Sequence, residues 1–440
     1  MINNLENITR RNYGMFGSWV RRTAFWTLDA LKGGTIKKHY NDIKYKMLNH
    51  TDQSQQLQKL LNHANHTTKF YKNLNVQDFK EFPVLNKQDF KERFDEFQSE
   101  LFVNKPLHQM STSGSTGTPF VVNQDMNKRK RTLADIIYFK EIAGQKLGDK
   151  YIFFRVWTEK NKKSKLEQFK QNLIPIDILH LDDASLEKIR LLLKHKKSIN
   201  SALAYASTYE HLVNYLYSCG DTPEMFNIKS FISGSEVLNM NIKQRIKETI
   251  GCNIIDRYSN QENGIIAQTD DLSDEFIVNT ASYYVELLKL DSDEEAEVGE
   301  LGRIVITDLY NFAMPMIRYD TGDLAIKCEE SKGTVRKFRS VQGRQVDTFY
   351  DTKGNKITAH AWSVYMWKFN RLKQYQFIQN GQKDYILKVN GAEGIYTKEE
   401  LDSTIREIVG QDARIEIQYV DSIPVLASGK FKKTICNFKP

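Results

Sequence analysis

One stretch of the sequence decides how the rest is interpreted: Met110-Ser111-Thr112-Ser113-Gly114-Ser115-Thr116-Gly117-Thr118-Pro119-Phe120. It places hydroxyl side chains and glycines side by side. Glycine lets backbone N–H groups approach a ligand without a Cβ in between, and successive N–H groups form a concavity that favours anions. The stretch therefore predicts a phosphate-binding loop, although a flexible Ser/Gly linker has the same composition. It is not a Walker A loop, because no Gly-Lys-Ser/Thr closes it.

The chain beyond this loop alternates predicted strands with predicted helices. Strands are expected at 151–157, 174–179, 202–206, 229–234 and 253–258. This alternation indicates βαβ units and mostly parallel sheets, in which ligands bind beyond the carboxyl ends of the strands. Two turns fall at such positions, namely Ser233-Gly234-Ser235-Glu236 and the segment that ends in Gln261-Glu262.

The remaining chain predicts a further subdomain and a further domain. Residues 276–324 are typical of a β-rich subdomain, and the residues after it of a small α+β unit. The expected fold class is α/β, with a large domain of mostly parallel sheets flanked by helices, a β-rich subdomain and a small C-terminal α+β domain. The predicted boundaries are a helical, basic arm at 1–80, a core domain at 81–342 and a mobile C-terminal domain at 343–440.

The composition is that of a soluble globular protein, with 40% hydrophobic and 27% charged residues. Cys219, Cys252, Cys328 and Cys436 lie far apart and have neither zinc-site nor redox-motif spacing. They are expected to be reduced thiols, which favours a cytoplasmic location. Neither a signal peptide nor an apolar run long enough to span a bilayer is visible in the sequence.

The net charge of +8 is unevenly distributed. Residues 1–50 hold nine basic and three acidic side chains, a net +6, and interleave them with aromatic residues such as Trp19, Phe25 and Trp26. A basic aromatic helix contacts an anionic membrane or a partner protein, or it packs its aromatic residues on its own domain. Nucleic acid is not an expected partner, because no nucleic-acid module is present and the remaining chain is nearly balanced in charge.

The order of these motifs resembles the adenylate-forming superfamily of acyl-CoA synthetases. Within it, the chain is most similar to the branch that contains phenylacetate–coenzyme A ligases, coenzyme F390 synthetase-like proteins and CapK-like capsule-biosynthesis proteins. The resemblance runs from about residue 80 to the end. It depends mainly on Ser111–Pro119 and on Pro315-Met316-Ile317-Arg318-Tyr319-Asp320-Thr321-Gly322-Asp323.

The resemblance implies a nucleotide site. The 111–119 loop (Ser111, Thr112, Ser113, Gly114, Ser115, Thr116, Gly117) would close over the phosphates of ATP. Ser233, Gly234, Ser235 and Glu236 would line the adenine pocket, and the Tyr258 ring would flank adenine. Glu262 would hold Mg²⁺, and Asp323 would bind the ribose hydroxyls. Gly343-Arg344 would lie at the domain hinge with Asp347 as its pivot, and Ser428-Gly429-Lys430 would form the C-terminal lysine loop.

The chemistry is consistent with these residue types. A carboxylate that attacks the α-phosphate needs two anions neutralised, which a metal on Glu262 and the Lys430 cation would do. Asp323 can accept both hydrogen bonds of a cis-diol, and Arg344 offers a rigid fork to oxygen atoms. The structural alternatives are a helix cap for Glu262, a turn for Asp323 and a solvated basic tail for Lys430.

The expected activity is ATP-dependent formation of an acyl-adenylate and transfer of the acyl group to a thiol, CoA in the family. One alternative is a CapK-like protein that transfers the acyl group to another acceptor in capsule or exopolysaccharide assembly. Another is a non-catalytic nucleotide-binding protein. The sequence departs from the family at Phe120, where many members have lysine, and in the segment Tyr258-Ser259-Asn260-Gln261-Glu262, which lacks the commoner glycine after tyrosine.

Overall fold

Side chains are described from residue 17 onward. The computed structural model describes the chain except for residues 1, 113–119, 156, 158–161, 179–180, 235, 237, 239, 271, 329–333, 343–348, 355, 358–361, 363–364, 367–368, 370–371, 373, 392–393, 425–432 and 439–440. Its α-helices are α1 Ile2–Leu31, α2 Thr35–Asn49, α3 Ser54–Thr67, α4 Lys87–Glu92, α5 Met126–Ile142, α6 Lys165–Gln171, α7 Asp183–His195, α8 Ala206–Ser218, α9 Met240–Ile250 and α11 Lys398–Val409. Short 3-10 turns lie at Phe79–Glu81, Phe94–Glu96, Glu100–Phe102 and Pro223–Met225.

The strands form one large sheet and several small ones. They are β1 His108–Thr112, β2 Phe120–Gln124, β3 Lys150–Arg155, β4 Leu173–Asp177, β5 Ile199–Tyr205, β6 Ser230–Gly234, β7 Asn253–Asn260, β8 Gly264–Gln268, β9 Phe276–Val278, β10 Tyr283–Leu288, β11 Leu301–Asp308, β12 Tyr319–Lys327, β13 Lys337–Gln342, β14 Phe349–Tyr350, β15 Lys356–Ile357, β16 Gln374–Gln379, β17 Asp384–Asn390, β18 Arg414–Tyr419 and β19 Thr434–Cys436.

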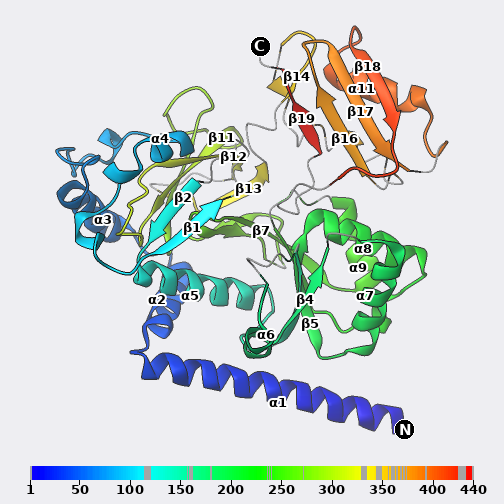
Figure 1. Cartoon of the computed structure of the whole chain (residues 1–440), viewed down its shortest axis with the longest axis horizontal. Coiled ribbons are helices and arrows are strands. Elements are labelled where there is room, and N and C mark those ends of the chain that lie inside the picture. Colours follow the sequence, from blue (N-terminus) through cyan, green and yellow to red (C-terminus); the bar gives the residue numbers. More distant parts are fainter. Residues whose placement is uncertain are drawn as a thin grey trace.

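The large sheet has eleven strands in the order β10-β11-β12-β13-β9-β8-β7-β6-β5-β3-β4. In this order, the neighbouring strands from β7 to β4 pair in parallel, and those from β10 to β7 pair antiparallel. The two halves share β7, so the β-rich part of the chain continues the parallel sheet (Figure 1). The predicted α/β fold class is confirmed.

Helices cover both faces of the parallel half because its strands are apolar on both sides. Ala202, Ala204 and Phe231 pack under α7, α8 and α9. On the opposite face, Ile232 and Ile255 pack against Ala143, which follows α5. Since alternate strand residues share a face, the residues two positions after Ile232 and Ile255, at the carboxyl edge, also face the α5 side.

The C-terminal residues form a small unit with its own core. Its four-stranded sheet has the order β18-β17-β16-β19, and α11 packs on it through Leu401, Ile405 and Val409. Thr397 caps the N-terminus of α11 in a capping box completed by Glu400. In Figure 1 this unit stands apart from the large sheet's flanking layers.

The N-terminal arm is helical, as expected. In Figure 1, α1 runs along the outside of the molecule, and α2 leads back toward α5. Phe25 and Trp26 of α1 pack toward Tyr40 of α2, whereas Trp19 and Leu28 are each 57% exposed. The arm therefore buries part of its aromatic residues on its own domain and leaves part in solvent. Among the described helices, none carries an apolar stretch of the length that a membrane span requires.

Candidate active site

The predicted phosphate loop joins the two strands of a hairpin. β1 and β2 pair antiparallel, with Ser111 opposite Val121 and Thr112 opposite Phe120, and the Ser111 side chain is exposed. The loop residues Ser113, Gly114, Ser115, Thr116 and Gly117 lie outside the described residues, as does the side chain of Thr112. Ser235, Arg344 and Lys430, with Gly343, Asp347, Ser428 and Gly429, also lie outside them.

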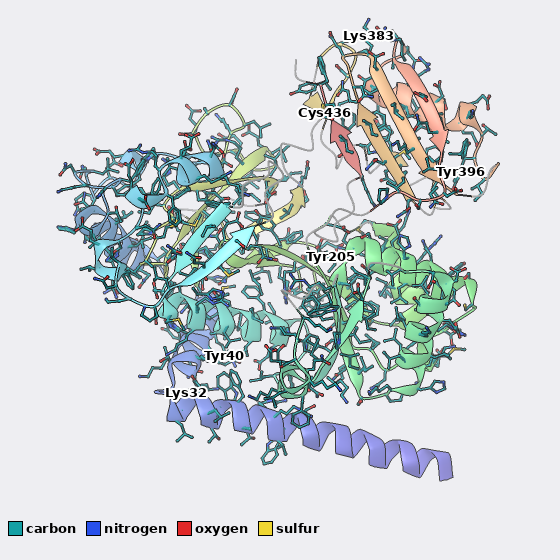
Figure 2. All side chains as sticks on the ribbon, viewed as in Figure 1. Lys32, Tyr40, Tyr205, Lys383, Tyr396 and Cys436 are labelled. Atoms are coloured by element: carbon teal, nitrogen blue, oxygen red, sulfur yellow. The ribbon has the colours of Figure 1, made fainter. Side chains whose placement is uncertain are left out.

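The carboxyl edge of the parallel strands holds the next group of predicted residues. Gly234 ends β6, where it pairs with Tyr205 on one side and with Arg257 on the other. Figure 2 shows Tyr205, the last residue of β5, on the side of the large sheet that faces the C-terminal unit. The Ser233 hydroxyl is fully buried, and the Glu236 carboxylate accepts a hydrogen bond of 2.8 Å from the Ser207 N–H at the start of α8.

Tyr258 and Asp323 come together from β7 and β12. The Tyr258 hydroxyl donates to Asp323 Oδ2 at 2.7 Å and lies 3.2 Å from Thr321 Oγ1. The Asp323 N–H in turn donates to Thr321 Oγ1 at 3.1 Å. Burial, with the neighbouring Asp323 charge, raises the pKa of Tyr258 well above its usual value, so the hydroxyl remains a donor to the carboxylate. This contact orients the carboxylate that was predicted to bind ribose.

Glu262 is buried in the turn between β7 and β8. Its carboxylate accepts a hydrogen bond of 3.2 Å from the Tyr319 hydroxyl, and its backbone carbonyl accepts one of 2.8 Å from Gln124 Nε2. Strand β8 follows this turn, so the alternative that Glu262 caps a following helix is wrong. Neither Gln124 nor the contact of Tyr319 with Glu262 was identified from the sequence, although Tyr319 lies inside the 315–323 motif.

A buried network supports the Glu262 turn from behind. Lys128 of α5 forms an ion pair with Asp308 at 2.6 Å, and both side chains are fully buried. Lys128 Nζ also donates to the Tyr283 hydroxyl at 3.2 Å, which donates to the backbone carbonyl of Asn263 at 2.6 Å. Sequence patterns place a lysine on the solvent face of a helix, so this network had no signal in the sequence.

A second buried ion pair lies directly before β12. Arg318 has a left-handed backbone, with φ of 49°, and donates to both carboxylate oxygens of Glu286 at 3.1 Å. Its third contact is a hydrogen bond of 3.0 Å to the Phe82 carbonyl. The guanidinium therefore joins β10 and the segment before α4 to the strand that carries Asp323.

The C-terminal unit contacts the large domain near the same edge. Lys433 Nζ lies 3.5 Å from Glu210 Oε2 of α8. Burial lowers the pKa of Lys433, but the facing carboxylates, first that of Glu210 and then that of Glu236, raise it, and the net shift is upward. Lys433 follows Lys430 of the predicted lysine loop by three residues in the sequence, and Lys433 itself lies beside α8.

The donor groups fit a nucleotide with its metal. Over the part of the chain that the structure describes, no cluster of three or more His, Cys, Asp or Glu side chains forms an all-protein metal site. Mg²⁺ at phosphates is ordinarily held by one or two carboxylates, waters and phosphate oxygens. A single buried carboxylate such as Glu262 meets that requirement only when the nucleotide supplies the remaining ligands.

Comparisons with known proteins show what the chain is similar to. Residues 349–437 match the family described as the CapK C-terminal domain. The chain is 21% identical to protein CapK of Staphylococcus aureus, over 93% of this chain and 94% of that protein. It is 22% identical to phenylacetate-coenzyme A ligase of Pseudomonas putida over 62% of each chain. A crystal structure of 2-hydroxyisobutyryl-CoA ligase in the postadenylation state, with R3-HIB-AMP bound, superposes with a TM-score of 0.68 at 16% identity, over 87% of this chain and 88% of that one.

The structural likeness shows that the chain has the fold of these ligases. Together with the match of residues 349–437 to the CapK C-terminal domain and the two sequence relatives, it supports the resemblance to the adenylate-forming superfamily and its CapK-like branch.

Proposed function

We propose that this protein activates a carboxylic acid with ATP, releasing pyrophosphate and retaining an acyl-adenylate. The observation that supports this most strongly is the contact of Tyr258 with Asp323, which presents an oriented carboxylate next to an aromatic ring at the edge of β7. Such a pair suits the ribose and base of a nucleotide. The buried Glu262 carboxylate lies in the turn that ends the same strand.

Each proposed residue has its own role, either in binding the nucleotide or in neutralising its charge. Asp323 accepts hydrogen bonds from the ribose hydroxyls, and Tyr258 fixes the Asp323 carboxylate while its ring flanks the base. Glu262 would hold Mg²⁺, which would neutralise phosphate charge. Lys430 and Arg344, both in the proposed C-terminal domain, would supply further positive charge. A carboxylate oxygen then bonds to the α-phosphorus, and the bond from this phosphorus to the pyrophosphate oxygen breaks.

The proposed domain division follows from this chemistry. Residues 81–342 would hold the nucleotide, and 343–440 would carry the lysine loop and turn about the hinge between the two half-reactions, with 1–80 as an arm. Domain closure of this kind is a common gating step.

Acid-dependent exchange of pyrophosphate into ATP tests the proposal. Glu262→Gln keeps the size of the side chain and removes its charge, so exchange should fall at least about a hundredfold, as expected for loss of a charge-stabilising group. The matched control is Glu224→Gln, on an exposed glutamate, which should keep full exchange. Exchange of equal rate in both variants would contradict the role of Glu262.

CoA is the proposed acceptor, and a capsule or exopolysaccharide acceptor is the alternative. The relatives support both, since they include a CoA ligase and a CapK protein. Adding CoA to the enzyme with its acid and ATP should convert bound adenylate into acyl-CoA within a turnover. Adenylate that persists with CoA present would favour the other acceptor.

The exposed face of α1 supports a proposed peripheral contact, either of an active ligase or of a non-catalytic nucleotide-binding protein. Trp19 and Leu28 are exposed, and Leu31 is 78% exposed. Asp29 faces inward and accepts hydrogen bonds from the first N–H groups of α2. Trp19→Ser/Leu28→Ser should reduce co-sedimentation with phosphatidylserine vesicles. Equal sedimentation of this variant would contradict a membrane contact through α1.

A further inference from the structure

Arg257 occupies an unusual position for a charged residue. It lies in the centre of the large sheet, at the carboxyl edge of β7, and is 7% exposed. Its Nε donates to Gln268 Oε1 at 2.7 Å, while its second terminal nitrogen, Nη2, is buried and has no hydrogen-bond partner. Buried arginines are ordinarily paired, because an uncompensated charge is costly to desolvate.

The guanidinium is held in place by an anchored neighbour. Gln268 Nε2 donates to the Phe139 carbonyl of α5 at 2.8 Å, which fixes the amide and turns its oxygen toward Arg257. Arg257 therefore lies on the α5 side of the sheet, as its alternation with Ile255 requires. A side chain with fixed orientation and an unused donor is preorganised for a ligand.

A second cation lies on the same side of the sheet, toward the amino ends of the parallel strands. Lys140, in the last turn of α5, has its Nζ 3.8 Å above the Tyr151 ring. Burial, together with repulsion from Arg257, lowers the pKa of Lys140 to about 7. Burial also lowers the pKa of Arg257 to about 10. In the described parts of the chain no carboxylate forms an ion pair with either residue, and Asp256 leaves β7 on the opposite face.

The sheet leaves room beside Arg257. Its neighbour across the ladder is Gly234, and among the described atoms a Cβ built there would meet only the Arg257 carbonyl oxygen, at 3.6 Å. On the other side of Gly234, its partner in β5 is Tyr205, which also lies at the carboxyl edge of the parallel strands. This edge adjoins Tyr258, so a substrate held at the proposed nucleotide site would reach it across the end of β7.

We propose that Arg257 binds a second anionic group of the carboxylic acid that the enzyme activates. The substrate class is then an acid with two anionic groups, a dicarboxylate or a phosphorylated acid, in which one carboxylate reacts and the other group pairs with the guanidinium. A planar fork with a free terminal nitrogen suits either group. This proposal rests on the proposed adenylation function and specifies its substrate.

The experiment compares acids that differ only in the second charge. Pyrophosphate exchange is measured with butyrate against succinate, hexanoate against adipate, and glycerate against 3-phosphoglycerate. The wild type should prefer the dianionic member of at least one pair at least about tenfold in kcat/KM, as expected for a charge-assisted hydrogen bond. The third pair distinguishes a phosphate from a carboxylate. A preference for the monoanion in every pair would overturn the proposal.

Variants separate recognition from folding. Arg257→Met should lower the ratio of kcat/KM for dianion over monoanion at least about tenfold, and Arg257→Lys, which keeps the charge without the fork, should lower it less. Arg414→Met, on an exposed arginine of β18, is the control. Without ligand, Arg257→Met should raise the melting temperature, because it removes an uncompensated buried charge. An unchanged ratio with a lowered melting temperature would indicate a structural role and overturn the proposal.

Two further measurements distinguish failure of the proposed adenylation from failure of the proposed anion site. ATP binding is followed by calorimetry, and thermal shifts with succinate, adipate and 3-phosphoglycerate are measured with ATP present. If ATP binds but no acid supports exchange, adenylation fails, and a thermal shift that Arg257→Met abolishes would still support the anion site. If these three probes give no shift in the wild type and no dianion is preferred in exchange, the anion site is refuted.

Discussion

The ion pair between Arg318 and Glu286 gives the sharpest stability prediction. The side chains are 5% and 10% exposed, and two parallel hydrogen bonds of 3.1 Å join them. Glu286→Ala leaves the guanidinium buried with the Phe82 carbonyl as its remaining partner. Breaking a buried pair from one side costs about 3–5 kcal/mol, because the other charge is then uncompensated. We expect a loss of this size in the free energy of unfolding.

Removing both charges should cost less than removing one. In the double variant Glu286→Leu/Arg318→Met no buried charge remains, and apolar replacements of buried pairs are often close to neutral. The remaining cost comes from the Phe82 carbonyl, which loses its Arg318 donor. A buried acceptor without a donor lowers the free energy of unfolding by about 1–3 kcal/mol. The single variant should therefore be the least stable of the three proteins.

Urea unfolding followed by tryptophan fluorescence measures this difference. The matched control is Glu248→Ala, on an exposed glutamate of α9, which should lie within about 0.5 kcal/mol of wild type. A loss below about 1 kcal/mol for Glu286→Ala, against the 3–5 expected, would refute the reasoning. So would a double variant that is no more stable than the single one.

Three further predictions follow from the site. Tyr258→Phe removes the donor to Asp323, so the KM for ATP in exchange should rise about three- to tenfold, with a smaller change in kcat; an unchanged KM would contradict the pairing. Tyr319→Phe removes the donor to Glu262 and should raise the Mg²⁺ concentration for half-maximal exchange, whereas superimposed Mg²⁺ titrations would contradict it. For Lys140, between pH 7 and about 10.4 the unfolded chain carries a proton that the folded chain lacks, so wild-type stability should gain up to about 1.4 kcal/mol per pH unit, and Lys140→Met should lose this gain. Urea unfolding midpoints of wild type and Lys140→Met, measured from pH 6 to 9, test this difference. If the midpoints of the two proteins change with pH in parallel, the prediction is refuted.

Local patterns predicted much of the parallel half. The strands expected at 151–157 and 174–179 are β3 and β4. Each contains a short apolar run, which is typical of a buried strand. The pairing of β13 between β12 and β9 was not predictable, because it joins segments far apart in the chain and no local pattern specifies such a neighbour.

The resemblance to the superfamily implied that Tyr258 and Asp323 bind one nucleotide, and the fold brings their side chains to 2.7 Å from distant strands. That nucleotide role remains a prediction. The partners that fix the Glu262 turn were missed, since Gln124 and Tyr283 have no distinctive neighbours in sequence. Phe120, noted as a departure from the family, is fully buried and packs on Phe90 and Tyr319. A lysine at this position would be buried among aromatic rings.

The most direct test of adenylation is to identify the product that stays on the enzyme. Purified protein is incubated with ATP, Mg²⁺ and pooled carboxylic acids without an acceptor, and the bound small molecules are analysed by mass spectrometry. We expect an acyl-AMP from at least one pool together with free pyrophosphate, and we expect the acyl-AMP to be lost in Lys430→Ala. Formation of ADP and phosphate instead, or ATP bound unchanged with every pool, would contradict this expectation.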